Sequence, residues 1–556
     1  MTVLKQFLSA ILAAIIGFFG TLSANLTDLV NNYEFTVDAS QSGRVLSNPA
    51  SNVNIWSIDG NPFVNQKNNE EYDIFDFVNY VQFMQCTGGN AERDLFLDPL
   101  DRTVLDDYDF TVLIDNCRGV LELGAKPMLK LGSVPLKYSA KANTDAEFST
   151  NIYPPDDYNV YYNYIAAISQ ALVDEFGRDE VLTWRFGVMT EYENASWFMA
   201  NGGDPEESAA EYCKLYDYTV AALTDVIGDV FVGAHSMTVT EGLWDEEIFI
   251  RHCAEGTNYK TGEKGTRICY LSASFYDSTP GKYTSGKTLA ETINYLRSTA
   301  EKYGLNNLIY GIDEGRILCG NTSGAGDDQL LSRTCGYTYQ AAYDARMYRT
   351  MFMNDINYFS SWDYLSNGLL DGNPTVSYYV AANAAKFGGA RLAQTEKTRR
   401  GFVPKAEVDA VSAFNNETNT LHIMAYNFKN KVDYTAPADL EFTVRAPQFA
   451  GKNVKITAYV IDDDCNWFDE WQQDRITYGI GDDCFGWSPD DPVVDNPTTL
   501  SDPEAREIYF NELKPKYYEC SKLVPTEYTA TVVNGEIVLD ITLAPHAVVF
   551  YEITPV

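Results

Sequence analysis

The sequence has little histidine and lacks closely spaced pairs of metal-binding side chains. Only four histidines occur in 556 residues, and no two of them stand in the His-x-x-x-His spacing of a helical zinc site. The ten cysteines are spread along the chain without a Cys-x-x-Cys pair, so their spacing predicts neither a zinc site nor a disulfide connectivity. We therefore expect no metal and no cofactor.

Positive charge is also scarce. The chain carries 41 basic and 78 acidic side chains, which gives a formal net charge of −37. A polyanionic partner would be repelled over most directions of approach, which argues against nucleic acid and anionic membrane surfaces as partners. Charge alone does not predict an oligomeric state.

Long hydrophobic runs are absent after the first 24 residues. The chain opens with a short basic segment ending at Lys5, and an apolar run over residues 7–24 follows, with no charge before Asp28. This pattern predicts a signal peptide over residues 1–24, cleaved near Ser23 or Ala24, and a secreted or cell-surface location. An uncleaved anchor is the alternative, because about 18 uncharged residues are just enough to span a membrane.

What the sequence does contain, from residue 51 onward, is a regular alternation of short apolar strands with amphipathic helices, which is typical of a parallel sheet with crossover helices. Eight such rounds predict a (β/α)8 TIM barrel over residues 51–390. One acidic helix is expected over residues 70–80. The expected barrel strands are 53–58, 81–86, 126–132, 181–188, 229–235, 268–276, 307–313 and 357–362.

The rhythm changes after the barrel. Residues 400–556 contain strand-like alternation broken by Gly, Pro, Asn and Asp turns, which predicts a C-terminal β-sandwich domain. Residues 25–50 contain similar alternation and are expected to join this sandwich, because a closed barrel offers no open edge. The acidic, proline-rich residues 482–503 are interpreted as a long solvated loop.

Two glutamates follow the ends of expected barrel strands. Glu191 comes after strand 181–188, and Glu314 comes after strand 307–313. The active site of a parallel barrel forms at the carboxyl ends of its strands, so both side chains should face the same cavity. Such a pair can hydrolyse glycosides, and the retaining mechanism needs carboxyl groups about 5 to 5.5 Å apart. Glu193 and Asp313 are the nearest competitors, but Glu193 lies further into its loop, and strand alternation should turn Asp313 away from Glu314.

The two roles demand different protonation states. Glu314 must be ionised to attack the sugar, whereas Glu191 must hold a proton for the leaving oxygen. We expect Arg316 or Tyr276 to stabilise the Glu314 anion, and the nearby anion to raise the pKa of Glu191.

With these residues in place, the chain resembles glycoside hydrolase family 39, the β-xylosidase and α-L-iduronidase family of clan A. Residues 123–132 resemble its third strand, with a Gly-x-x-Pro approach, and residues 459–471 resemble its sandwich segment, where an Ile-Asp pair precedes an Asn and a Trp. Residues 544–549 resemble its closing strand. The resemblance implies that Glu191 is the acid/base and Glu314 the nucleophile.

The sequence departs from the family pattern beside each glutamate. The family's Asn-Glu-Pro becomes Thr190-Glu191-Tyr192, and its threonine before the nucleophile becomes Asp313. The resemblance implies that the residue at 190 contacts the sugar 2-hydroxyl, and threonine has a shorter reach than asparagine. The identity of the sugar therefore stays open.

Several further residues are candidates for substrate binding. The resemblance implies that Tyr276, at the end of strand six, lies near the nucleophile and that Trp362, at the end of strand eight, forms the floor of the sugar subsite, with core packing as the alternative for Trp362. His235, at the end of strand five, either contacts substrate or satisfies a hydrogen bond at the rim. Asn90 follows strand two. Thr190 completes the predicted set.

These observations predict a secreted retaining glycoside hydrolase that cleaves terminal bonds of an oligosaccharide or glycoside, with a β-xylosidase-like specificity. One alternative is a carbohydrate-binding or scaffold protein that has lost catalysis, as the change at Thr190 would allow. Another is a clan A glycosidase directed at uronic acids, whose carboxylate would need a cation such as Lys130, Arg93 or Arg316.

Overall fold

The computed structural model describes most of the chain. The signal peptide predicted over residues 1–24 and the substrate-binding candidate Trp362 lie outside the described residues. Within the described ranges, no helix is long and apolar enough to cross a membrane. The described ranges are 31–57, 71–142, 144–146, 148–237, 242–277, 287–317, 337–360, 369–370, 372–401, 403, 406–431, 433–485, 497 and 500–556.

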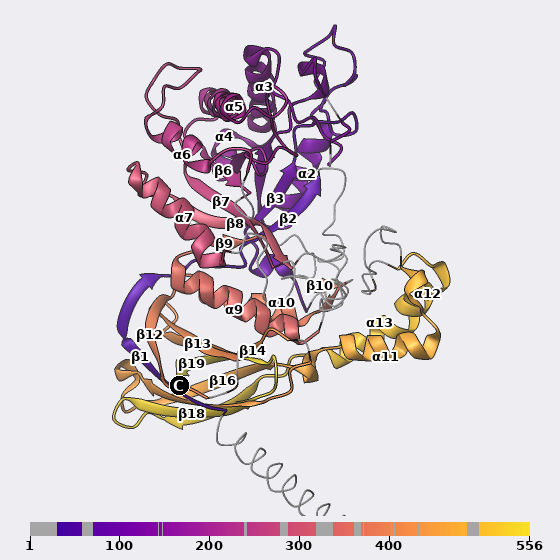
Figure 1. The fold of residues 1–556 in the computed structure, drawn as a ribbon. Helices are drawn as coiled ribbons and strands as arrows, with labels where there is room; N and C mark the ends of the chain where they lie inside the picture. Colours follow the sequence, from indigo (N-terminus) through magenta and orange to yellow (C-terminus); the bar gives the residue numbers. More distant parts are fainter. Residues whose placement is uncertain are drawn as a thin grey trace, which may run out of the picture.

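Eight parallel strands form the first domain, each beside its neighbour in chain order (Figure 1). This is the predicted TIM barrel, and the prediction of fold class is confirmed. The strands are β2 (Asn52–Ser57), β3 (Tyr80–Gln85), β4 (Lys126–Leu131), β5 (Arg185–Val188), β6 (Phe231–Ser236), β7 (Tyr270–Asp277), β8 (Ile309–Ile317) and β9 (Tyr358–Phe359).

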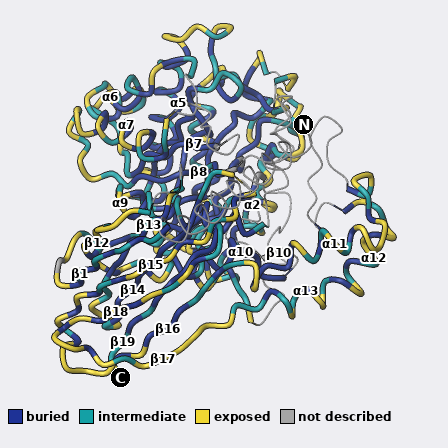
Figure 2. Tube along the Cα trace, turned by 60° about the horizontal axis from the view of Figure 1, so that its bottom comes forward, coloured by how far each residue is buried: buried dark blue, intermediate teal, exposed yellow. Residues whose placement is uncertain are grey.

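Helices cover the outside of the barrel, and the strands between them are largely buried (Figure 2). The helices begin where the sequence provides caps: Asp204 accepts a hydrogen bond from the backbone N–H of Glu207, and Pro205 takes the first helical position of α5. The helices are α2 (Thr111–Glu122), α3 (Tyr158–Phe176), α4 (Arg178–Val181), α5 (Pro205–Val226), α6 (Glu246–Glu255), α7 (Leu289–Lys302), α9 (Tyr339–Asn354) and α10 (Val376–Ala385).

Three local predictions in the barrel are wrong. Within the described part of residues 70–80 only a short 3-10 turn, η2 (Ile74–Asp76), forms before β3 begins. Val181 belongs to α4 rather than to the fourth strand, since β5 begins at Arg185. The seventh strand, β8, continues past residue 313 because its pairing with β7 extends to Ile317. Glu314 therefore lies inside a strand and not after it.

The second domain is a single mixed sheet of nine strands in the order β17-β16-β19-β14-β13-β12-β1-β15-β18. The sheet folds over on itself, because Phe442 of β15 packs against Tyr551 of β19, with ring centroids 6.1 Å apart, although four strands lie between β15 and β19 in the order. The result is a sandwich-like core. The strands are β1 (Asn32–Val45), β12 (Arg391–Arg399), β13 (Ala406–Asn415), β14 (Thr420–Lys429), β15 (Ala438–Arg445), β16 (Asn453–Ile461), β17 (Thr526–Thr531), β18 (Glu536–Leu543) and β19 (Val548–Pro555).

The first described strand belongs to this second domain and not to the barrel that follows it. β1 pairs antiparallel with β12 and parallel with β15, and the indigo strand lies among orange and yellow strands in Figure 1. The sheet also begins earlier than the predicted boundary at 400, because β12 starts at Arg391. Helix α9 connects the domains, where Arg349 donates a hydrogen bond to the carbonyl of Ala410 in β13.

A small helical unit interrupts the second sheet between β16 and β17. It contains α11 (Phe468–Tyr478), α12 (Pro503–Ile508), the π turn η8 (Tyr509–Leu513) and α13 (Lys514–Cys520). Trp467, Trp471 and Tyr517 form its core, and Trp467 donates from its indole N–H to the carbonyl of Pro374 at 2.9 Å. The predicted solvated loop over 482–503 lies between α11 and the start of α12, and most of it lies outside the described residues; its described part begins with the 3-10 turn η6 (Asp482–Cys484). The helices on either side of it were not predicted.

Candidate active site

Glu191 projects from a strained turn at the carboxyl end of β5. Met189 and Glu191 both adopt left-handed backbone conformations, with φ of 62° and 41°, each of which costs about 1–2 kcal/mol for a residue with a side chain. Two backbone hydrogen bonds hold the turn: Tyr192 donates to the carbonyl of His235 at 3.1 Å, and Asn194 donates to the carbonyl of Glu191 at 2.8 Å. The turn therefore fixes where the Glu191 side chain begins.

Glu314 is directed by a different device, a β-bulge in β8. Ala273 of β7 pairs with Ile312, but Ser274 pairs with Glu314, so Asp313 is an extra residue in β8. The displaced carbonyl of Asp313 accepts hydrogen bonds from the side chains of Asn54 in β2 and Gln82 in β3, two strands that do not pair with β8. The bulge breaks the strand alternation that we expected to turn Asp313 away, and Asp313 and Glu314 both lie on the side of Lys130.

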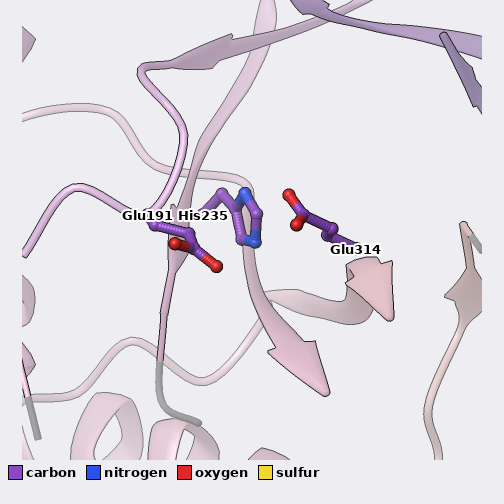
Figure 3. Close-up of side chains that lie close together, drawn as sticks. All are labelled: Glu191, His235 and Glu314. Atoms are coloured by element: carbon purple, nitrogen blue, oxygen red, sulfur yellow. The ribbon is translucent and has the colours of Figure 1, made fainter. Parts of the chain in front are cut away.

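The two glutamates meet at the mouth of the barrel. One carboxylate oxygen of Glu191, one of Glu314 and one ring nitrogen of His235 all lie within 4.8 Å of one another. Figure 3 shows the two carboxylates approaching from opposite sides, with the imidazole between them. This separation is close to the roughly 5 to 5.5 Å of retaining glycosidases and shorter than the roughly 6.5 to 9.5 Å of inverting ones.

Each carboxylate has its own hydrogen-bond donors. Ser274 donates from its hydroxyl to Oε1 of Glu191 at 2.6 Å, and Asn194 donates from its side-chain amide to Oε2 at 2.8 Å. Tyr276 donates to Oε1 of Glu314 at 2.5 Å. Tyr276 thus lies beside Glu314, where the sequence placed it, whereas Ser274 and Asn194 were not predicted.

The glutamate that we expected to be ionised, Glu314, has a raised pKa. Burial, together with the charge of Glu191, raises the pKa of Glu314 to about 8, against the lowering effects of Tyr276 and Lys130. Two carboxylates this close cannot both ionise easily, so near neutral pH the pair holds one proton between them. The second expected stabiliser, Arg316, points elsewhere, because its guanidinium forms a two-pronged ion pair with Asp344.

A buried cation lies beneath the pair. The ammonium of Lys130 in β4 has no solvent exposure and makes three polar contacts, with Asp313 Oδ2 at 3.1 Å, Thr190 Oγ1 at 3.2 Å and His235 Nδ1 at 2.6 Å. Thr190 and His235 are therefore members of a network inside the barrel, and Thr190 is only 3% exposed. The two residues that depart from the family pattern, Thr190 and Asp313, both contact this one lysine.

The remaining candidates have structural partners. Glu193 is fully buried, and its Oε1 accepts hydrogen bonds from the hydroxyl of Ser236 and the backbone N–H of Met237, both at 2.6 Å. It therefore fastens its loop to the end of β6. Asn90 accepts hydrogen bonds from the backbone N–H groups of Glu92 and Arg93, so its side chain holds a turn after β3.

Glu191, His235 and Glu314 are close enough to contact a common metal ion, but their hydrogen bonds favour another arrangement. Nδ1 of His235 lies against Lys130, and Nε2 lies 2.9 Å from the hydroxyl of Ser274. Both ring nitrogens therefore have partners. The donor set fits a hydrogen-bonded carboxylate pair better than a metal site.

The residues that sequence reasoning missed carry recognisable signals. Ser274 lies two residues before Tyr276 on β7, and residues i and i+2 of a strand share one face. Asn194 lies three residues after Glu191 in a turn, where a side-chain amide can reach back. The eight described cysteines are all free thiols, so no pairing among them helps to form the site.

Known proteins resemble this chain in sequence. A family model described as "Glycosyl hydrolases family 39" matches residues 101–474, more than half of the chain. A β-xylosidase from Geobacillus stearothermophilus is 30% identical over 105 residues, which is 19% of either chain. An α-1,4-L-rhamnosidase from Formosa agariphila is 21% identical over 332 residues, 58% of this chain and 61% of the relative. The chain thus covers less than two thirds of these relatives.

Solved structures share the fold over nearly the whole chain. A monomeric β-xylosidase from Caulobacter crescentus has a TM-score of 0.62 at 16% identity, with 94% of this chain and 99% of that chain covered. A bacterial orthologue of human α-L-iduronidase has a TM-score of 0.66 at 13% identity, with 95% and 84% covered. At these identities the likeness establishes the fold alone.

Proposed function

The chain belongs to glycosyl hydrolases family 39, and from this premise we propose that it is a secreted retaining glycosidase, with Glu191 as acid/base and Glu314 as nucleophile. The observation that carries the mechanism is the separation of the two carboxylates, which is within 4.8 Å. An inverting mechanism needs a wider separation, because a water molecule must fit between the general base and the sugar. The position of each glutamate at the mouth of the barrel supports the same assignment.

The proposed reaction has two displacements. In the first, an oxygen of Glu314 bonds to the anomeric carbon as the bond to the leaving oxygen breaks, and Glu191 gives its proton to that oxygen. In the second, Glu191 takes a proton from water, the water oxygen bonds to the anomeric carbon, and the ester bond to Glu314 breaks. The product keeps the configuration of the substrate.

The first displacement needs the shared proton on Glu191. The positive charge that develops at the anomeric carbon, next to Glu314, favours the ionised form of that residue. As this charge develops in the transition state, it would reverse the resting preference, in which Glu314 has the raised pKa. Because the two carboxylates interact this strongly, they titrate as one unit and not as two independent acids.

The proposed substrate is a terminal sugar with a β-xylosidase-like linkage, supported by the β-xylosidases among the relatives. The similarity to a rhamnosidase makes an α-L-rhamnoside the second substrate to test. The uronic-acid alternative has less support, because Lys130 and Arg316 are already paired with Asp313 and Asp344 inside the protein. Loss of catalysis is disfavoured by the complete carboxylate pair.

A panel of nitrophenyl glycosides, followed by NMR of the first-formed product, tests the proposal. We expect turnover on β-D-xyloside or a related glycoside, and a product anomer that matches the substrate before mutarotation. An inverted product would exclude the retaining mechanism, and sugar binding without turnover would favour the carbohydrate-binding alternative. Secretion is tested separately, by N-terminal sequencing of protein recovered outside the cell.

A further inference from the structure

A continuous line of hydrogen bonds runs inside the barrel from a buried cation to the acid/base glutamate. Lys130 Nζ lies 2.6 Å from His235 Nδ1, His235 Nε2 lies 2.9 Å from Ser274 Oγ, and Ser274 Oγ lies 2.6 Å from Glu191 Oε1. Lys130, His235 and Ser274 are at most 1% exposed. Water therefore has little access to this line.

The chemistry of the groups fixes the direction of this line. An ammonium group has three donors and no acceptor, and the three contacts of Lys130 with Asp313, Thr190 and His235 match those donors. His235 Nδ1 must then accept, so its proton is on Nε2 and is donated to Ser274. Because the oxygen of Ser274 accepts there, its own hydrogen is left for Glu191 Oε1.

We propose that Lys130, His235 and Ser274 are positioning residues that reserve Oε1 of Glu191 as a hydrogen-bond acceptor and so confine the catalytic proton to Oε2. This inference rests on the acid/base role proposed above. Both oxygens of Glu191 accept from a donor, but Ser274 is fully buried and its direction is fixed by the line, whereas Asn194 is half-buried in the turn and can turn away when Oε2 carries the proton. The line therefore selects which oxygen protonates the leaving group.

If these hydrogen bonds ran in the opposite direction, the catalytic proton would lie on Oε1 of Glu191, where it cannot reach the leaving group. If His235 carried its proton on Nδ1, Nε2 would accept from Ser274, and Ser274 would accept from a proton on Glu191 Oε1. That proton would point into the barrel and away from the sugar. Lys130 prevents this arrangement, and burial, with the charge of Lys130, lowers the pKa of His235 well below its usual value, so the ring stays neutral.

The charged and titratable groups around Glu191 come from several strands. Glu314 and Asp313 on β8, Tyr276 on β7 and Lys130 on β4 face the same interior, and Glu193 lies in the same turn. Any change at Lys130 therefore also disturbs Asp313, whose buried charge would lose its partner at a cost of several kcal/mol. The test must remove both charges together.

The kinetic test compares Ser274→Ala and the double variant Lys130→Met/Asp313→Asn with a matched control, Lys126→Met. Lys126 is on the same strand, but it pairs with Glu180 at the other end of the barrel. The measurement is kcat/KM for aryl glycosides whose leaving groups differ in pKa. We expect about 10–100-fold loss with poor leaving groups and under about threefold loss with good ones, because only the former need the acid.

A second readout does not depend on turnover. The chain has only four histidines, so ¹⁵N-histidine NMR can resolve the ring of His235. We expect a neutral Nε2–H tautomer from about pH 5 to 8 in the wild type, and a shift toward Nδ1–H in the double variant.

The outcomes separate the two proposals. An Nδ1–H ring in the wild type, equal losses across all leaving groups, or no loss at all in either variant would overturn the positioning role. If the wild type hydrolyses no glycoside, the proposed function fails, and the NMR result still decides the direction of the hydrogen bonds.

Discussion

The ends of β5 and β8 each deliver one glutamate to the barrel mouth, but they do so by different means. At β5 a turn with two left-handed residues places Glu191, and donors then hold both of its oxygens. At β8 a single inserted residue, Asp313, shifts the register with β7 and so sets the position of Glu314, which accepts a hydrogen bond from one described donor, Tyr276. Glu191, the proposed acid/base, is thus held at two points, while Glu314, the proposed nucleophile, has one described donor.

The largest loss of activity should come from removing the glutamate of β8. Glu314→Ala removes the proposed nucleophile, and we expect kcat to fall by at least about 10⁴-fold, since no covalent intermediate can form. Azide, which fits the space left by the carboxylate, should restore turnover and give a glycosyl azide of inverted configuration. A retained azide product would reassign the nucleophile.

Removing the glutamate that follows β5 should reduce activity less, and mainly on substrates with poor leaving groups. Glu191→Ala should lower kcat/KM about 10²–10⁴-fold on substrates with poor leaving groups and much less on dinitrophenyl glycosides. Azide should then yield a product of retained configuration, because Glu314 still forms the intermediate. If the two alanine variants respond alike to leaving group and azide, the contrast between the two strand ends is wrong.

Tyr276→Phe removes the hydrogen-bond donor of Glu314 and leaves the carboxylate in place. The hydroxyl lowers the pKa of Glu314, so its loss should raise that pKa and move the alkaline limb of the pH profile upward from about 8. A hydrogen bond to a charged group is worth about 1.5–3 kcal/mol, which predicts roughly 10–100-fold lower activity at the optimum. Steady-state kinetics from pH 5 to 9 measure both effects, and an unchanged limb would contradict the pairing.

The smallest effect should appear in stability. The folded-state pKa of Glu314, about 8, is above its unfolded value, so the folded protein binds the extra proton and stability should fall as pH rises from about 4.5 to 8. Glu314→Gln removes this penalty, and its Tm should exceed that of the wild type by about 2 °C at pH 8 and match it near pH 4. Thermal unfolding at both pH values checks the sign, with Glu407→Gln on the exposed face of β13 as a control.

The barrel and the two glutamates could be predicted because they depend on local patterns. Apolar strands alternate with amphipathic helices, and the carboxyl ends of the strands share one face. The bulge at Asp313 could not be predicted, because alternation counts residues along one strand, whereas a bulge is a mismatch in register between two strands. The same limit concealed the contacts of Lys130, which depend on Asp313 being turned inward.

The helical unit around Trp467 and Tyr517 was missed for a different reason. Its segments are short and rich in charge, and their apolar faces pack against one another rather than against the main cores. A weak helical period in such segments is outweighed by acidic and proline residues. The raised pKa of Glu314 was missed likewise, since we considered the role of each carboxylate and not the burial of the pair.

The position of β1 also has a consequence for how the chain is made. β1 lies between β12 and β15 in the sheet, and β15 follows it by about 400 residues, so at about 5–20 residues per second it waits tens of seconds for that partner. During synthesis the whole barrel emerges while this strand is still unpaired. Its alternating apolar side chains, Tyr33, Phe35 and Val37, are then a surface for a chaperone or for another nascent chain. Cutting the protein after the barrel would leave that state permanent.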